Sequence, residues 1–189
     1  MGFKTFLETM RNKPTAYCWD LDDTLVKTDA KIIVLDSLSG DIKRKLSPHE
    51  FNTYRLGKDE DFEFSEFSSG DILKNTAKKT DYWKVAQNIS DAISRGDSNS
   101  VLYIITARPY TLEKELYEYL FRNGLKALKQ INVHALGGKD DGVTIAQHKK
   151  DVLADIKKKH GEVVFFDDDT ENIELAKALK TIKTRHVKV

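Results

Sequence analysis

A short apolar run that ends abruptly in carboxylates constrains this chain more than any other feature. Residues 16–19 (Ala-Tyr-Cys-Trp) are apolar enough for a buried parallel strand, and Asp20, Asp22 and Asp23 follow almost at once. Carboxylates gathered at a strand end repel one another and add nothing to a core, but a cation among them makes the cluster tolerable. In α/β sheets, ligands bind at the carboxyl ends of the strands. The run therefore predicts a strand end with a chemical role.

A second apolar run, far along the chain, ends in the same way. Residues 163–166 are followed by Asp167 and Asp168. If the two strands are neighbours in a parallel sheet, their carboxyl ends converge, and so many close carboxylates require a divalent cation. Hard oxygen ligands favour Mg²⁺, which keeps positions open for water and a substrate phosphate. Either cluster alone fits a solvated turn equally well; the two together favour the cation.

Strands and helices alternate along most of the chain. Strands are expected at 15–20, 101–105, 131–136, 163–166 and 184–189, and helices at 2–12, 81–95, 111–121, 143–159 and 171–180. This alternation predicts an α/β fold in which a Rossmann-like, mainly parallel sheet is flanked by helices. We expect a single domain over residues 1–189, with the 2–12 helix covering one sheet edge.

Residues 26–80 differ in texture and are too long for a simple connection. Alternating apolar and polar residues around a turn at 39–41 predict a β-hairpin, and residues 47–50 (Ser-Pro-His-Glu) form a good helix start. Acidic and aromatic residues over 59–67 predict an extended segment with one buried face. The sequence thus predicts a small β-rich insertion after the first strand, acting either as a small cap or as a structural flap.

Three further side chains are candidates for phosphate chemistry. Thr106 and Arg108 follow an apolar strand, where a hydroxyl could donate to a phosphoryl oxygen and a guanidinium could grip phosphate as a fork. A turn hydroxyl and a surface charge are the alternatives. One lysine of the pair Lys149 and Lys150 could balance the carboxylates. Leu153, one turn later, should face the core and favours Lys149.

Composition narrows the class of protein. The chain is 40% hydrophobic and 32% charged, and its net charge of +1 gives no footprint for bulk nucleic-acid or membrane binding, although a local basic groove stays open. The single cysteine, Cys18, excludes an internal disulfide framework and fits a reducing compartment. No signal peptide is expected in residues 1–14. We therefore expect a cytoplasmic protein with no membrane contact and no evident obligate protein partner.

Four motifs together resemble those of the haloacid dehalogenase-like (HAD) superfamily of phosphohydrolases. They occur in the family's order and on the expected elements: Asp20-x-Asp22-x-Thr24, Thr106, Lys149 and Asp167-Asp168-x-x-x-Asn172. The motifs span residues 16–180, with 26–80 outside them. Two positions depart from the family pattern, since Asp23 stands where members usually carry glycine and Asn172 where many carry aspartate.

The resemblance implies a two-step phosphoryl transfer with Mg²⁺ as cofactor. Asp20 would attack phosphorus and become a phosphoaspartate, and Asp22 would protonate the leaving oxygen and then activate the hydrolytic water. The implied catalytic residues are Asp20, Asp22, Thr106 and Lys149; the implied substrate contacts are Thr24 and Arg108; the implied metal ligands are Asp20, the main-chain carbonyl of Asp22, and Asp168, with Asp167 close by.

The resemblance leaves the substrate open. Only about 40 residues separate Thr106 from Lys149, which leaves no room for a large second cap. A small cap suits bulky phosphorylated substrates, and residues 106–109 (Thr-Ala-Arg-Pro) are similar to HAD-type polynucleotide 3′-phosphatases and deoxyribonucleotidases. A nucleotide or nucleic-acid end is expected ahead of other phosphorylated small molecules. A non-catalytic scaffold and a phosphotransferase are the alternatives.

Overall fold

A five-stranded sheet forms the main body of the protein. The computed structural model describes residues 14–51, 53–127, 131–138 and 141–188. The strand order is β8-β7-β1-β9-β10, and every neighbouring pair is parallel. The strands are β1 (Thr15–Trp19), β7 (Val101–Pro109), β8 (Ile131–Gly137), β9 (Glu162–Asp167) and β10 (Lys183–His186). The predicted Rossmann-like parallel sheet is therefore confirmed, while the helix expected over 2–12 lies outside the described residues.

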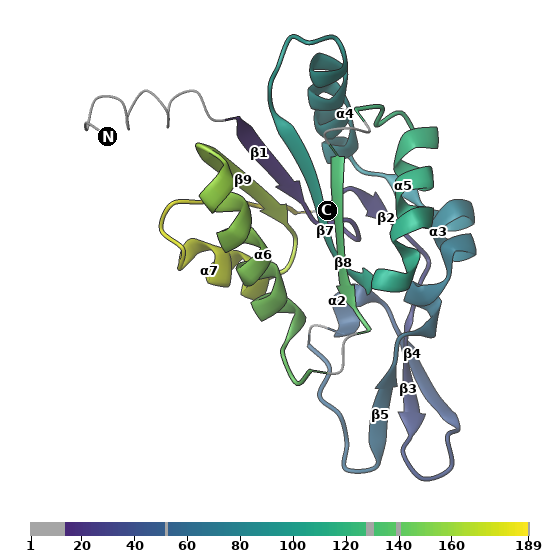
Figure 1. Ribbon diagram of the computed structural model, residues 1–189. Coiled ribbons are helices and arrows are strands. Elements are labelled where there is room, and N and C mark those ends of the chain that lie inside the picture. Colours follow the sequence, from purple (N-terminus) through teal and green to yellow (C-terminus); the bar gives the residue numbers. More distant parts are fainter. Residues whose placement is uncertain (1–13, 52, 128–130, 139–140, 189) are drawn as a thin grey trace.

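Two pairs of helices cover the two faces of this sheet (Figure 1). On one face lie α4 (Asp81–Ser94) and α5 (Glu113–Arg122), with the short helix η2 (Tyr110–Leu112) before α5; on the other lie α6 (Ile145–Lys159) and α7 (Thr170–Lys177). Each layer closes its own hydrophobic core against the sheet. Within the described part of the chain, no helix is both long and apolar enough to cross a membrane.

The central strand β1 contributes to both cores because successive side chains point to opposite faces. Ala16 and Cys18 pack in the core under α6 and α7, whereas Trp19 packs in the core under α4 and α5. The Trp19 ring stacks on Phe166 of β9 with ring centroids 3.7 Å apart. Cys18 is fully buried, and burial raises the pKa of its thiol, as expected of a small core residue and not of a nucleophile.

The position of β1 decides where a ligand can bind. Its neighbours are β7 on one side and β9 on the other, so the chain changes direction across the sheet at this strand. In open α/β sheets such a switch point leaves a crevice at the carboxyl ends of the strands. Asp20, Asp22, Asp167 and Asp168 all lie at that edge.

Residues between β1 and α4 form a small antiparallel unit. The strands β2 (Val26–Lys27) and β6 (Lys78–Lys79) pair as its stem. Beyond the stem, β3 (Ile32–Asp36) pairs with both β4 (Ile42–Leu46) and β5 (Glu60–Glu63), and the short helices α2 (Pro48–Phe51), η1 (Ser65–Ser68) and α3 (Gly70–Thr76) complete it. The predicted hairpin and the small β-rich insertion are present, and the three-stranded sheet projects beyond the carboxyl edge of the main sheet (Figure 1).

A small core of its own holds the insertion together. Its buried members are Ile32, Val34 and Leu46, against which Phe51 and Phe62 pack. The helix α2 begins with the predicted capping box: the Ser47 main-chain N–H donates to Glu50 Oε2 at 2.7 Å, and the Glu50 N–H donates to Ser47 Oγ at 3.3 Å.

Candidate active site

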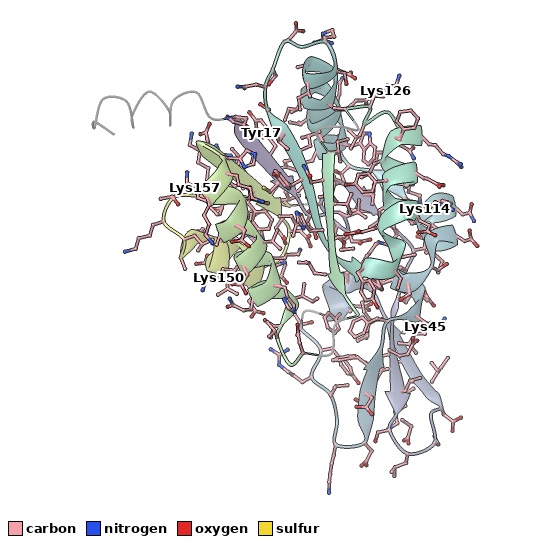
Figure 2. The ribbon with its side chains drawn as sticks, in the orientation of Figure 1. Tyr17, Lys45, Lys114, Lys126, Lys150 and Lys157 are labelled. Atoms are coloured by element: carbon pink, nitrogen blue, oxygen red, sulfur yellow. The ribbon has the colours of Figure 1, made fainter. Side chains whose placement is uncertain are left out.

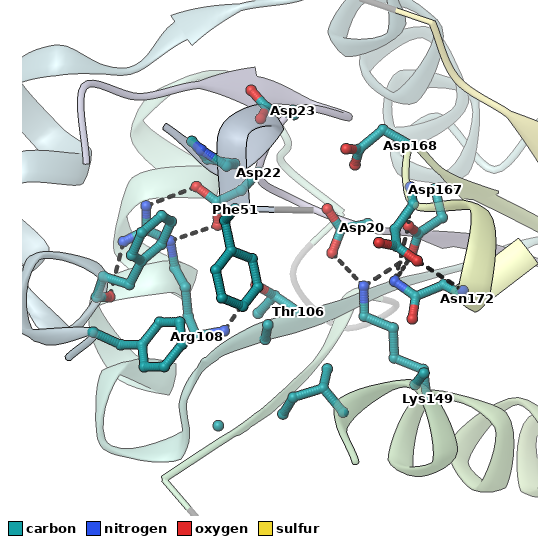
Figure 3. Close-up of a pocket in the computed structure, with 18 of the residues that line it drawn as sticks. Asp20, Asp22, Asp23, Phe51, Thr106, Arg108, Lys149, Asp167, Asp168 and Asn172 are labelled. Carbon is teal, nitrogen blue, oxygen red and sulfur yellow. Dashed lines mark hydrogen bonds and ion pairs between the residues drawn. The ribbon is translucent and has the colours of Figure 1, made fainter. Parts of the chain in front are cut away.

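A cavity of about 580 Å³ opens where β1, β7 and β9 end (Figure 3). It is lined from the main body by most of the predicted site residues: Asp20, Asp22, Thr106, Arg108, Lys149, Asp167 and Asp168. Thr24 is the exception, because its side chain is fully buried and does not line this cavity. The structure thus brings residues more than 140 positions apart to one edge of the sheet.

Lys149 lies at the centre of the carboxylate cluster. Its Nζ donates to Asp20 Oδ1 at 2.6 Å and to Asp167 Oδ2 at 2.8 Å, and only 3% of its surface is exposed. Burial by itself would lower the pKa of Lys149, but the two carboxylates outweigh it and hold the pKa above its usual value. The neighbouring Lys150 points to the outer side of α6 and is partly exposed (Figure 2).

The carboxylates carry more negative charge than Lys149 balances. Burial raises the pKa of Asp20 well above its usual value; Lys149 lowers it, and the nearby charges of Asp167 and Asp168 raise it again. The pKa of Asp168 is likewise raised to about 6, first by burial and then by Asp167. A further positive charge at this edge would therefore stabilise the ionised cluster.

Asp167 is engaged by protein donors on both of its oxygens. Besides the Lys149 ammonium, the Asn172 side-chain amide donates to the two oxygens at 3.0 and 3.1 Å, and the Asp169 N–H donates to Oδ1 at 2.9 Å. Asp169 in turn caps α7 by accepting from the Asn172 N–H. Asn172 therefore fixes the orientation of Asp167, a role that its side chain could not reveal from sequence.

Thr24 contacts Asp168 and not the cavity. Its hydroxyl donates to Asp168 Oδ1 at 3.0 Å, and this hydrogen bond opposes the rise in the pKa of Asp168. The direct contact between Thr24 and substrate stays a prediction. The third residue of the first motif lies behind the site, where it orients a carboxylate of the fourth motif.

The donor set fits Mg²⁺ at two of the predicted ligands. Within the described residues, no three acidic, histidine or cysteine side chains already form a metal-binding group, and the Lys149 ammonium bridges Asp20 and Asp167. Asp20 and Asp168 are hard oxygen donors, and burial first and the charge of Asp167 second raise the pKa of both, so a divalent cation would stabilise their ionised forms. Asp167 fits less well, because its two oxygens are already engaged.

Arg108 is bound to Asp22 in the arrangement seen here. Its Nε and one terminal nitrogen donate to the two Asp22 oxygens at 2.9 and 2.8 Å, a bidentate pair in which the guanidinium is fully buried. The other terminal nitrogen donates to the Phe67 carbonyl of η1 at 3.1 Å. The arginine that sequence assigned to substrate phosphate therefore connects the insertion to Asp22, and Figure 3 shows this pair on one side of the cavity and Lys149 on the other.

The strand β7 reaches the site through a close backbone approach. Thr106 Oγ1 accepts from the Arg108 N–H at 3.2 Å, and the pairing of β7 with β8 becomes irregular between Thr106 and Pro109. At Gly137 of β8, an added Cβ would lie 2.1 Å from the Ala107 carbonyl oxygen. Only glycine allows the two strands to approach this closely, so Gly137 sets the position of Thr106 and Arg108.

Asp23 adopts a backbone conformation that favours glycine. Its φ is +53°, in the left-handed region. An aspartate at this position therefore strains the backbone where glycine would not, but aspartate tolerates the left-handed region better than most residues. The turn it forms places Asp22 beside the cavity.

No protein-family model and no curated protein matches the chain. Among solved structures, a HAD family enzyme from Bacteroides thetaiotaomicron is similar, with a TM-score of 0.45 and 11% sequence identity over 93% of this chain and 94% of that chain. That enzyme was solved as an aspartate-to-alanine mutant with magnesium and inorganic phosphate. The roles of individual residues are inferred below from the geometry of this site alone.

Proposed function

We propose that this protein is a Mg²⁺-dependent phosphatase that hydrolyses a phosphomonoester through a phosphoaspartate on Asp20. The observation that carries the proposal is the buried Lys149 ammonium, which holds Asp20 and Asp167 at the mouth of a cavity on the switch-point edge of the sheet. Surface lysine–carboxylate pairs contribute little to stability. Burying a cation among carboxylates costs desolvation free energy, so such a cation points to a functional use. Phosphoryl transfer supplies that use, because it depends on positioning and on stabilising charge.

Asp20 and Asp22 divide the covalent chemistry between them. A carboxylate oxygen of Asp20 forms a bond to phosphorus while the bond to the leaving oxygen breaks, and Asp22 gives that oxygen a proton. Water then attacks phosphorus, its proton passes to Asp22, and Asp20 and inorganic phosphate are released. Because Arg108 engages both Asp22 oxygens, one of these hydrogen bonds must open before Asp22 can carry the proton.

The remaining residues orient and neutralise. Lys149 and the Thr106 hydroxyl face the region where the phosphoryl oxygens would lie, and Thr24 holds Asp168 in place. Bound Mg²⁺, held by Asp20, Asp168 and the Asp22 carbonyl, would supply positive charge to the phosphoryl group. As substrate we propose a nucleotide or a nucleic-acid end, and we propose that the insertion over residues 26–80 acts as a small cap.

Phosphate release from p-nitrophenyl phosphate and from a panel of phosphorylated metabolites, with Mg²⁺ and with EDTA, tests the proposal. The Asp20→Asn variant should fold and lose activity, while Asp71→Asn on α3 serves as a matched control with full activity. A hydroxylamine-sensitive phosphoenzyme should form in the wild type and be missing from Asp20→Asn. Equal turnover in the two proteins, or turnover indifferent to EDTA, contradicts the proposal.

The same assays separate the two alternatives. No turnover on any member of the panel, including 3′-phosphorylated oligonucleotides, favours a non-catalytic scaffold with a HAD-like fold. If added alcohol diverts the phosphoryl group from water to the alcohol at high yield, the protein is a phosphotransferase that uses the same site.

A further inference from the structure

The geometry points to a substrate whose leaving group carries a flat aromatic ring and no second phosphate, with the ring lying against Phe51 and Phe64 of the insertion. This inference rests on the proposed phosphatase function and narrows its substrate class. Phe51, Phe64 and Phe67 are called the aromatic wall here. All three rings line the same cavity as Asp20 and Lys149.

The aromatic wall faces the catalytic residues. The Phe51 ring projects into the cavity between the Asp22–Arg108 pair and the Asp20–Lys149 pair (Figure 3). Ile32 and Pro48 of the insertion continue the apolar surface on that side. A phosphoryl group at Asp20 would therefore direct its leaving group toward a surface built from the insertion.

The wall is pre-organised at one end and open at the other. Phe51 makes edge contacts with Phe62, at 4.8 Å between ring centroids, and with Phe64, at 5.6 Å. Phe62 belongs to the insertion's own core, so Phe51 is held in place. Phe64 is 45% exposed although it is large and apolar. An exposed ring beside a catalytic cavity offers a flat surface for another ring to stack on.

The charges of the cavity oppose a second phosphate. Among the described residues that line it, Arg108 and Lys149 are the cationic side chains, and both are paired with aspartates. The acidic lining residues are Asp20, Asp22, Asp23, Asp167, Asp168, Asp169 and Glu171. A single phosphoryl group could be balanced by Lys149 and a divalent cation, but a further phosphate would meet carboxylates and would be repelled.

A neighbouring hollow provides the competing possibility. It has a volume of about 590 Å³, shares Asp23, Pro48 and Asp168 with the cavity, and contains none of the wall rings. Its cationic lining includes four lysines, Lys27, Lys31, Lys78 and Lys188. A polyanion such as an oligonucleotide end would favour this hollow. The wall is the stronger indication, because it belongs to the cavity that holds Asp20.

A matched pair of substrates isolates the ring. Adenosine 5′-monophosphate and ribose 5-phosphate share the same primary alkoxide leaving group, so their difference in kcat/KM with Mg²⁺ reports the base. Comparing kcat/KM for benzyl phosphate and propyl phosphate makes the same test with a simple phenyl ring. The two pairs together show whether the protein prefers a nucleobase or any aromatic ring. We expect the ringed partner to be favoured about tenfold or more in at least one pair.

Three variants test whether the preference resides in the wall. Phe64→Ala should reduce the favoured ratio about tenfold, and Phe64→Leu should also reduce it, because leucine keeps apolar volume but not the flat ring. Leu38→Ala is the matched control: Leu38 is another apolar side chain of the insertion, 88% exposed and outside the cavity, and its variant should keep the wild-type ratio. Circular dichroism checks that each variant is folded.

The outcomes separate the wall from the proposed function. Equal kcat/KM within both pairs, or a ratio unchanged in Phe64→Ala, overturns the inference while leaving the phosphatase intact. A higher kcat/KM for a 3′-phosphorylated oligonucleotide than for the ringed substrates, reduced in Lys27→Ala, also overturns the inference. If the wild type turns over no substrate, the proposed function fails. The wall is then tested by calorimetry with adenosine: binding that weakens in Phe64→Ala supports it, and no binding overturns it.

Discussion

The main sheet and the insertion are built on opposite principles. Every strand pair of the main sheet is parallel, and helices cover both of its faces, so its side chains reach deep into two cores. The insertion is antiparallel, and the four residues 42–45 of β4 are exposed to solvent. Among its described residues, the buried members of its own core cluster are Ile32, Val34 and Leu46. The main sheet is stabilised by a hydrophobic core on each face, whereas the insertion is stabilised by one small core.

This difference matches what each region contributes to the cavity. The main body, meaning the five-stranded sheet and its flanking helices, supplies charged groups held by several partners, such as Lys149 of α6 with two carboxylate partners. The insertion supplies apolar rings that belong partly to its core and partly to the cavity. In the proposed function, the main body would carry the chemistry that requires precise placement, and the insertion would recognise the leaving group.

The largest expected contrast lies between two lysines. Lys149→Met leaves Asp20 and Asp167 buried without a countercharge, and should cost about 3–5 kcal/mol of stability and about 100- to 1,000-fold in activity. Lys45 of the insertion pairs with Glu66 at 2.8 Å but is 50% exposed, so Lys45→Met should cost less than about 1 kcal/mol. Urea unfolding and phosphatase assays measure both. Similar losses in the two variants would show that the regions do not differ in this way.

A second contrast compares two glycines. Gly137→Ala forces Cβ against the Ala107 carbonyl, and should cost about 1–3 kcal/mol and lower activity at least about tenfold by displacing Arg108. Gly40, in the β3–β4 turn, has φ of +76° and no atoms near its added Cβ. Gly40→Ala should cost about 1 kcal/mol of backbone strain and leave activity unchanged. Full activity in Gly137→Ala would mean that β7 adjusts without moving its side chains.

Opposite pKa shifts sharpen the comparison further. The pKa of Asp168 is about 6 in the folded protein and 3.8 as a free group, so its ionisation costs stability that returns as pH falls from 6 toward 4. Asp36 of the insertion has its pKa lowered, first by the Ser39 N–H and then by Lys43. Its ionised form therefore stabilises the fold, and this is lost as pH falls below its unfolded pKa.

Urea unfolding at pH 5 and pH 7.5 tests these signs. With EDTA at pH 7.5, Asp168→Asn should gain up to about 3 kcal/mol over the wild type, and the gain should shrink at pH 5. Asp36→Asn should lose stability at both pH values. Mg²⁺ should stabilise the wild type more at pH 7.5 than at pH 5 and should have little effect on Asp168→Asn. A Mg²⁺ effect that survives in this variant would remove Asp168 from the metal site.

The smallest expected effect lies at the junction between the two regions. Asp23→Gly relieves a φ of +53° and should stabilise the protein by about 0.5–1 kcal/mol. Lys180, with φ of +54° in the turn after α7, is the matched control and does not line the cavity. Lys180→Gly should bring a similar gain without altering KM. Thermal unfolding measures both, and a loss of stability in Asp23→Gly would show that its side chain contributes more than the strain costs.

Sequence reasoning succeeded where one strand or helix decides the outcome. A buried parallel strand must be apolar throughout, so the sequence predicted β1, β9 and the acidic residues that follow them. The spacing to Leu153 favoured Lys149 over Lys150 as the inward-facing lysine. It failed where the partner is distant in sequence. Thr24 donates to Asp168, which is 144 residues away, and Arg108 donates to Asp22, which is 86 residues away. Both hydrogen bonds depend on side-chain directions that no local sequence pattern encodes.

The insertion shows the same limit in another form. Alternation predicted its hairpin, and a capping box predicted the start of α2, because both are local. Which aromatic side chains of the acidic segment face the cavity depends on how the insertion packs against the main sheet. Phe62 and Phe64 differ by two positions, yet the first packs in the core of the insertion and the second is largely exposed at the cavity.

One guanidinium has a consequence for how substrates would be sorted. Since Arg108 grips the Phe67 carbonyl and the Asp22 carboxylate at once, a displacement of the insertion is relayed to the proposed proton donor across a few hydrogen bonds. Molecules that fit the insertion poorly would then be turned over slowly as well as bound weakly. Small phosphate esters that are abundant in a cell could therefore bind in the pocket and dissociate without being hydrolysed.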